Sequence, residues 1–161
     1  MNTIEIYRNY FNTISDLSDE SNPFHKYNKW ISENLRIVKM NDFNELLEDP
    51  DISRYMRVNN VTEQGMCYCN AGKIVSSSIQ GVSYCEGYFL LDDLPIPFDH
   101  AWIKYKGRYY DTTIRDGGVN PEYALIHEFE SNDIIEYQLK LKRYGPYIPE
   151  YFNEQFNTNI I

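Results

Sequence analysis

The chain has 161 residues, of which 42% are hydrophobic and 16% aromatic, so it fits one globular domain with a buried core rather than a disordered chain. Its formal net charge is −9 and it carries no basic stripe, which argues against binding to nucleic acid. Because it lacks a secretory signal and an apolar run of about 20 residues, and has an odd count of three cysteines, we expect a cytoplasmic protein with free thiols and no membrane contact.

The first 64 residues are expected to be mainly helical. The helical spacing of apolar residues predicts one helix over residues 3–15 and a second from Phe24 to Leu35. Residues 42–57 predict one or two short helices, interrupted at Pro50. We expect these helices to precede the part of the chain that carries chemistry.

The middle of the chain predicts a helix followed by strands. A third helical pattern covers residues 66–77, and residues 80–91 are rich in strand formers. The segment "DDLPIPFD" contains two prolines and is predicted to be a loop. Residues 100–113, "HAWIKYKGRYYDTT", predict a hairpin that turns at Lys106–Gly107.

The C-terminal part gives weaker signals. The stretch "RDGGVNPE" predicts a loop, after which Pro121 is expected to open a short helix through Phe129. Residues 133–144 are ambiguous, and the tail beyond them is expected to pack loosely or fray. The order of elements predicts a single α+β domain over residues 1–161, with a helical part (1–64), a core (65–113) and a C-terminal extension (114–161).

The hairpin places a histidine and an aspartate on one face. Side chains alternate along a strand, so His100 and Trp102 share a face. A turn centred on 106–107 puts Trp102 opposite Asp111 and His100 diagonal to it, at a backbone distance of about 7–8 Å. An imidazole–carboxylate hydrogen bond is within reach at that spacing. Such an aspartate would fix the tautomer of His100 and stabilise its protonated form.

Of the three cysteines, Cys67 is the best candidate for a nucleophile. It begins a predicted helix, where the helix dipole stabilises a thiolate. Cys69 lies about 200° further around that helix, and Cys85 lies within a strand, so both are expected to be core residues. A zinc site built from the three cysteines and His100 would lack the usual spacing of paired cysteines, and we predict no metal.

Four short blocks follow one another between residues 65 and 113. They comprise Gly65, Cys67 and Ala71, then Gly87 and Tyr88, then His100, Ala101 and Trp102, then Asp111 and Thr113. Their order and spacing resemble the transglutaminase-like branch of the papain-fold cysteine enzymes, with Thr112 in place of the family's proline. The resemblance implies a papain-like fold, in which a nucleophile helix packs on a small antiparallel sheet.

The resemblance also implies a Cys–His–Asp triad of Cys67, His100 and Asp111. Such a triad would perform acyl transfer or hydrolysis on an amide, in a peptide or a glutamine side chain, through a cysteine thioester and without a cofactor. The substrate would be a protein or peptide, and the enzyme a protease, amidase, deamidase or transglutaminase.

Three further residues are candidates for contact with the substrate or the reacting oxygen. Trp102 is expected to form a wall beside the histidine. Glu86 is a candidate for selecting a cationic or amine-bearing substrate. Gln64 is a candidate to complete an oxyanion hole with the backbone N–H of Cys67.

Two alternatives stay open. The first is an inactive papain-like scaffold that acts as a protein-binding module, such as a virus-encoded module that binds a host factor. The second is an acyltransferase similar to the arylamine N-acetyltransferases, although the chain has no recognisable motif for acyl-coenzyme A. The sequence leaves the substrate, the acyl acceptor and the oligomeric state open.

Overall fold

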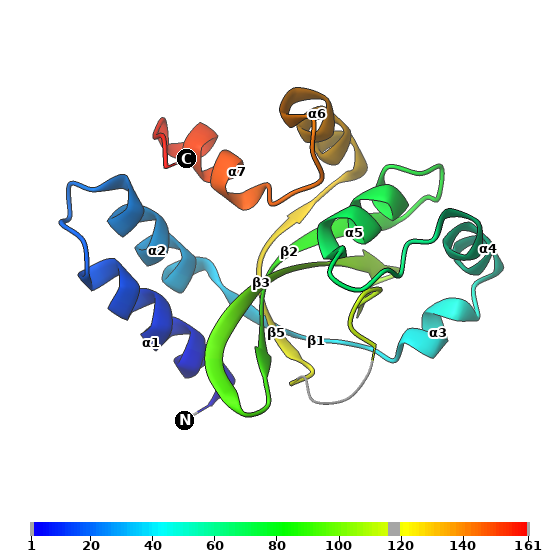
Figure 1. The fold of residues 1–161 in the computed structure, drawn as a ribbon, viewed down its shortest axis with the longest axis horizontal. Helices are drawn as coiled ribbons and strands as arrows, with labels where there is room; N and C mark the ends of the chain where they lie inside the picture. The colour runs from blue at the N-terminus through cyan, green and yellow to red at the C-terminus, as the bar shows by residue number, and fades with distance from the viewer. Residues whose placement is uncertain (1, 116–119, 161) are drawn as a thin grey trace.

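The computed structural model describes residues 2–115 and 120–160. Within these ranges it contains seven helices and one five-stranded antiparallel sheet, so the predicted α+β class is confirmed (Figure 1). The helices are α1 (Thr3–Asp16), α2 (Pro23–Asn34), α3 (Phe43–Leu47), α4 (Pro50–Asn59), α5 (Cys67–Val75), α6 (Ser131–Leu141) and α7 (Ile148–Phe156). The strands are β1 (Arg36–Lys39), β2 (Val82–Leu91), β3 (Leu94–Tyr105), β4 (Arg108–Tyr110) and β5 (Glu122–Phe129).

The N-terminal helices begin where their capping residues place them. Asn2 and Glu5 form a capping box at α1, and the side chain of Asn22 accepts a backbone hydrogen bond at the start of α2. Asp49 caps α4, whose first residue is Pro50. These ends confirm the predicted helices and the predicted break at Pro50, whereas strand β1 was not predicted.

The predicted β3–β4 hairpin forms with the predicted register. Ile103 pairs with Tyr110 and Tyr105 with Arg108. The two turn residues, Lys106 and Gly107, have φ values of 50° and 78°, the left-handed backbone of a two-residue hairpin turn. With this register, Asp111, which directly follows β4, lies close to His100 of β3.

The sheet curls until its two edges meet. Its strand order is β1-β5-β2-β3-β4, yet the backbone of Met40, just after β1, forms a bridge with Tyr109 of β4. The N–H of Asn41 donates to the carbonyl of Tyr109 at 2.8 Å. The side chains of the inner face pack together as one cluster, hereafter the inner cluster, formed by Val38, Cys85, Phe89, Trp102, Tyr123 and Leu125.

The opposite face of the sheet packs against the helices (Figure 1). Alternate residues of β2 and β3, such as Tyr84 and Ile103, join Ile74 of α5 and Phe11 of α1 in a separate, larger core. Helix α5 contacts both β3 and β2. No helix within the described residues is long and apolar enough to span a membrane.

Two element assignments in the second half of the chain are wrong. The segment "DDLPIPFD" is not a loop throughout, because β3 begins at Leu94. Its prolines are tolerated because β4 pairs only with Ile103–Tyr105 and leaves the start of β3 as a sheet edge. The helix predicted from Pro121 is strand β5, which pairs with both β1 and β2.

The tail does not fray. Residues 148–156 form α7, with Ile148 and Phe152 buried. The ambiguous segment 133–144 falls largely in α6. Of the loop predicted at 115–122, residues 116–119 lie outside the described residues.

Candidate active site

The predicted imidazole–carboxylate pair forms at the end of the hairpin. The Nε2–H of His100 donates to Oδ2 of Asp111 at 2.7 Å, and the two residues are only 3% and 4% exposed. The other carboxylate oxygen accepts the backbone N–H groups of Thr113 at 2.8 Å and Ile114 at 2.9 Å. A turn directly after β4 therefore fixes the orientation of the carboxylate.

Tyr123 is a fourth donor to the same carboxylate. Its hydroxyl group donates to Oδ2 of Asp111 at 2.8 Å, and burial raises the pKa of this tyrosine well above its usual range. Sequence reasoning missed this contact because Tyr123 lies in the segment predicted as a helix. A strand assignment would have placed it on one face with Leu125.

Cys67 is the first residue of α5, and its side chain is partly exposed. No side-chain hydrogen bond caps this helix end. Burial lowers the pKa of His100, but the hydrogen bond with Asp111 and the nearby Cys67 thiol outweigh it and raise the pKa to about 9. The fold thus brings together the three residues of the predicted triad.

Asn70 ties the nucleophile helix to the turn that holds Asp111. Its buried side-chain amide donates to Oγ1 of Thr113 and to the carbonyl of Glu63, both at 2.8 Å. Glu63 belongs to the turn before α5, in which Gly65 has a φ of 78°. These hydrogen bonds tie the N-terminal end of α5 to the turn before it and to the turn that follows Asp111.

The other two cysteines lie in different surroundings. Cys85 is fully buried in the inner cluster, and burial raises the pKa of its thiol well above the usual range. Cys69 is partly exposed on α5. No group of three or more potential metal-ligating His, Cys, Asp or Glu side chains forms in residues 2–115 and 120–160.

Trp102 lies beside the histidine, with the ring centroids 6.3 Å apart and the planes at 24°. It is fully buried, so it lines the interior of the sheet and is not retained as a substrate contact. Gly87 makes room for it, because a Cβ there would lie 3.0 Å from the indole ring and 2.0 Å from the carbonyl oxygen of Ala124. The indole N–H has no hydrogen-bond partner among the described residues.

Glu86 has a structural position rather than the predicted substrate contact. It is 2% exposed, and its carboxylate accepts the backbone N–H groups of Tyr147 and Ile148 at 2.9–3.0 Å and the hydroxyl group of Tyr84 at 3.0 Å. Burial raises its pKa to about 7, although these hydrogen bonds act in the opposite direction. The carboxylate therefore anchors the start of α7, and we no longer assign it to substrate selection.

Gln64 lies exposed in the turn before α5. The turn is closed by the N–H of Met66, which donates to the carbonyl of Glu63 at 3.3 Å. The contribution of Gln64 to an oxyanion hole stays a prediction.

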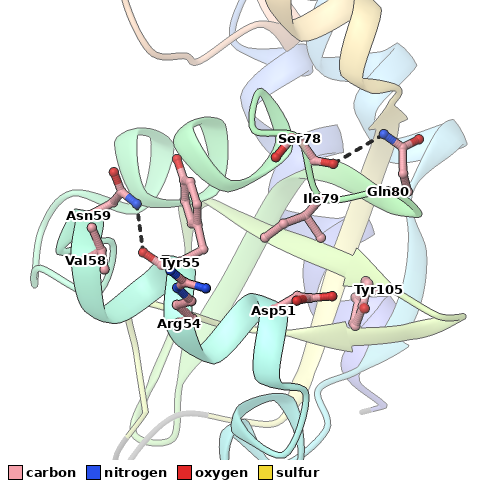
Figure 2. A pocket seen from close by; sticks show the side chains of 9 residues that line it. All are labelled: Asp51, Arg54, Tyr55, Val58, Asn59, Ser78, Ile79, Gln80 and Tyr105. Atoms are coloured by element: carbon pink, nitrogen blue, oxygen red, sulfur yellow. Dashed lines mark hydrogen bonds between the residues drawn. The ribbon is translucent and has the colours of Figure 1, made fainter.

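Among the pockets on the surface of the described residues, four have volumes between about 430 and 690 Å³. The largest of these four, about 690 Å³, lies beside α4 and the turn after α5, where Tyr55, Ile79 and Tyr105 contribute to its lining (Figure 2). The smallest of the four, about 430 Å³, reaches Asp111 and Tyr123 from the side of residues 40–44. None of the four includes Cys67 or His100 in its lining.

Comparisons of the chain with protein-family models, curated proteins and solved structures find no match. The resemblance to transglutaminase-like enzymes therefore rests on the motif residues and on their arrangement.

Proposed function

We propose that the protein is a papain-like cysteine enzyme of the transglutaminase-like kind, which hydrolyses or transfers the acyl group of an amide. The observation that carries the proposal is the buried hydrogen bond between His100 and Asp111, with Cys67 at the start of α5 near enough to raise the pKa of the same imidazole. A nucleophile, a base and a group that orients the base are the three parts that covalent acyl transfer requires.

The chemistry would proceed in two steps. The Cys67 thiolate attacks the amide carbonyl carbon, and His100 gives its proton to the departing amine, leaving a thioester on Cys67. Water, or a second amine, then attacks the thioester carbonyl carbon while His100 accepts the proton, and the C–S bond breaks to release the Cys67 thiolate. Water would yield a carboxylic acid and an amine would yield a new amide, so the acceptor decides between hydrolysis and cross-linking.

The N-terminus of α5 supports the developing oxyanion in this proposal. The backbone N–H of Cys67 lies in the first turn of the helix, where no side chain caps it. Such groups point out of the helix and favour negative charge. Gln64 would add the second donor from the preceding turn.

A competition among the three cysteines tests the proposal. We expect iodoacetamide to alkylate Cys67 much faster than Cys69 or Cys85 at pH 7, and this preference to disappear in the His100→Ala variant. Peptide mapping by mass spectrometry reads each site separately. Incubation with glutamine-containing peptides and amines should then give a thioester on Cys67 and none in Cys67→Ser. Equal, slow alkylation of all three thiols would contradict the proposal.

A protein-binding module is the second candidate function. It is favoured by the near-complete burial of His100 and Asp111. In that case the His–Asp pair would serve only to hold the hairpin end. Slow alkylation of Cys67 in a folded chain would support this function.

A further inference from the structure

Tyr123 shares one carboxylate oxygen with the histidine of the site. Oδ2 of Asp111 accepts the His100 Nε2–H at 2.7 Å and the Tyr123 hydroxyl group at 2.8 Å, while Oδ1 accepts the backbone N–H groups of Thr113 and Ile114. Both side chains that meet at Oδ2 are withdrawn from solvent, since His100 is 3% and Tyr123 2% exposed. The two donors therefore compete for the charge of one buried oxygen.

We propose that Tyr123 is a positioning residue that weakens the hold of Asp111 on the His100 proton. A hydroxyl group that donates to Oδ2 stabilises the carboxylate charge there and leaves less of it to stabilise the imidazolium ion. A general acid works best when it is not held too tightly in its protonated form. The catalytic meaning of this inference rests on the proposed function, but its effect on proton affinity does not.

The ring of Tyr123 also fixes the geometry of the shared oxygen. It meets the His100 ring edge-on, with the centroids 6.0 Å apart at 75°, and meets the Trp102 ring at 5.3 Å and 82°. The tyrosine is on β5, the histidine on β3, and the strand between them is β2. The titratable groups that act on His100 are Asp111 after β4, Cys67 on α5 and, through Asp111, Tyr123.

Nuclear magnetic resonance titration of the His100 ring in the full chain tests this inference. In Tyr123→Phe we expect the pKa of His100 to rise by about 0.5 to 1 unit, a roughly three- to tenfold gain in proton affinity. The matched control is Tyr137→Phe, which removes a hydroxyl group that donates to Glu154 at 2.7 Å, in the contact between α6 and α7. We expect the control to leave the His100 titration unchanged. An unchanged or lowered His100 pKa in Tyr123→Phe would overturn the inference.

A second replacement keeps the test decisive if Tyr123→Phe fails to fold. Incorporation of 3,5-difluorotyrosine at position 123 retains the ring and makes the hydroxyl group a stronger donor, so the His100 pKa should fall. A purely structural role for Tyr123 predicts no shift. Alkylation of Cys67 in the parent chain is measured separately: slow alkylation would count against the proposed function while leaving the titration result intact.

Discussion

Asp111 gathers four hydrogen-bond donors on one buried carboxylate. Two come from the backbone of its own turn, and two from the side chains of His100 and Tyr123. An aspartate that only closed a turn would need the first two. The side-chain donors arrive from β3 and β5, so the carboxylate is the point at which the curled sheet fixes the imidazole.

Replacement of Asp111 by asparagine should therefore make His100 less basic. Without the carboxylate charge, burial of the ring is opposed only by Cys67, and the His100 pKa should fall from about 9 to its ordinary value near 6.5 or below. At pH 7 the imidazole would then be largely neutral, and Cys67 alkylation should slow by at least about tenfold. Ring titration and peptide mapping measure the two effects. Asp16→Asn, which alters an exposed residue at the end of α1, is the control. A His100 pKa that stays near 9 in Asp111→Asn would be inconsistent with this account.

Glu86 should make stability depend on pH in a defined window. Its pKa is about 7 in the folded chain and about 4.5 ordinarily, so between these pH values the folded state binds more protons than the unfolded state. The unfolding free energy should therefore fall as pH rises from about 4.5 to 7, by about 3 kcal/mol in total. Glu86→Gln should flatten that slope in denaturant titrations, and Glu136→Gln, an exposed change, should retain it. Equal slopes in Glu86→Gln and the parent would contradict the buried carboxylate as the cause.

At the scale of elements, Gly87 allows two structural features to coexist. The indole ring of Trp102 lies against Gly87 and contacts Tyr123, and β5 comes close to Gly87 at a register shift between Glu86 and Gly87. A methyl group there would lie 2.0 Å from a backbone oxygen, which cannot move away as a side chain does. Glycine is thus required by space, since no positive φ is involved.

We expect Gly87→Ala to separate β2 from β5 and to lower the unfolding free energy by about 3 kcal/mol or more, in the range of severe overpacking. Gly81→Ala is a useful comparison, because nothing lies within 4 Å of a Cβ at that position and the cost there is backbone strain from a φ of 75°. Denaturant midpoints measure both variants. A Gly87→Ala protein as stable as the parent would show that β5 can shift to accommodate the methyl group.

The elements that the sequence predicts well are those with local signals. The apolar spacing of α1 and α2 and the Lys106–Gly107 turn are local patterns, and the turn aligns His100 with Asp111. Strand β5 carries no such signal. Its residues Tyr123 to Ile126 are all buried, alternately in the inner cluster and in the helix-covered core, so they form a continuous apolar run without a period of two.

The candidate site was predictable to the same extent. Cys67, His100 and Asp111 each lie in a short motif that can be recognised from the residues around it. Tyr123 reaches the site because β5 pairs with β2, and no local motif indicates that pairing. Glu86 was misassigned because its partners, Tyr147 and Ile148, lie 61 and 62 residues along the chain, in a tail without a strong pattern. The positions of Tyr123 and Glu86 both depend on contacts between segments far apart in the sequence, which local patterns do not reveal.

At the scale of the whole molecule, helices from the two ends of the chain, α2 and α7, pack together through aromatic side chains. Trp30 of α2 contacts the rings of Tyr151, Phe152 and Phe156 of α7, and Tyr151 stacks on His127 of β5 at 4.2 Å. Figure 1 shows α7 between α2 and α6, on the helical side of the sheet. The start of α7 is bonded to Glu86, which neighbours Cys85 of the inner cluster.

This linkage predicts that the helical layer and the sheet unfold together. Phe152, 2% exposed, packs against Tyr27 and Trp30, so Phe152→Ala should cost about 3–5 kcal/mol, whereas Phe156→Ala, at a residue 52% exposed, should cost about 1 kcal/mol or less. Circular dichroism follows the helices, and reaction of the buried Cys85 with a thiol reagent follows the opening of the sheet. If α7 belongs to the same cooperative unit, Phe152→Ala lowers the denaturant midpoint equally by both probes. If Cys85 stays protected after the helices have melted, the sheet is stable without α7, and the tail would be a separate unit that only covers it.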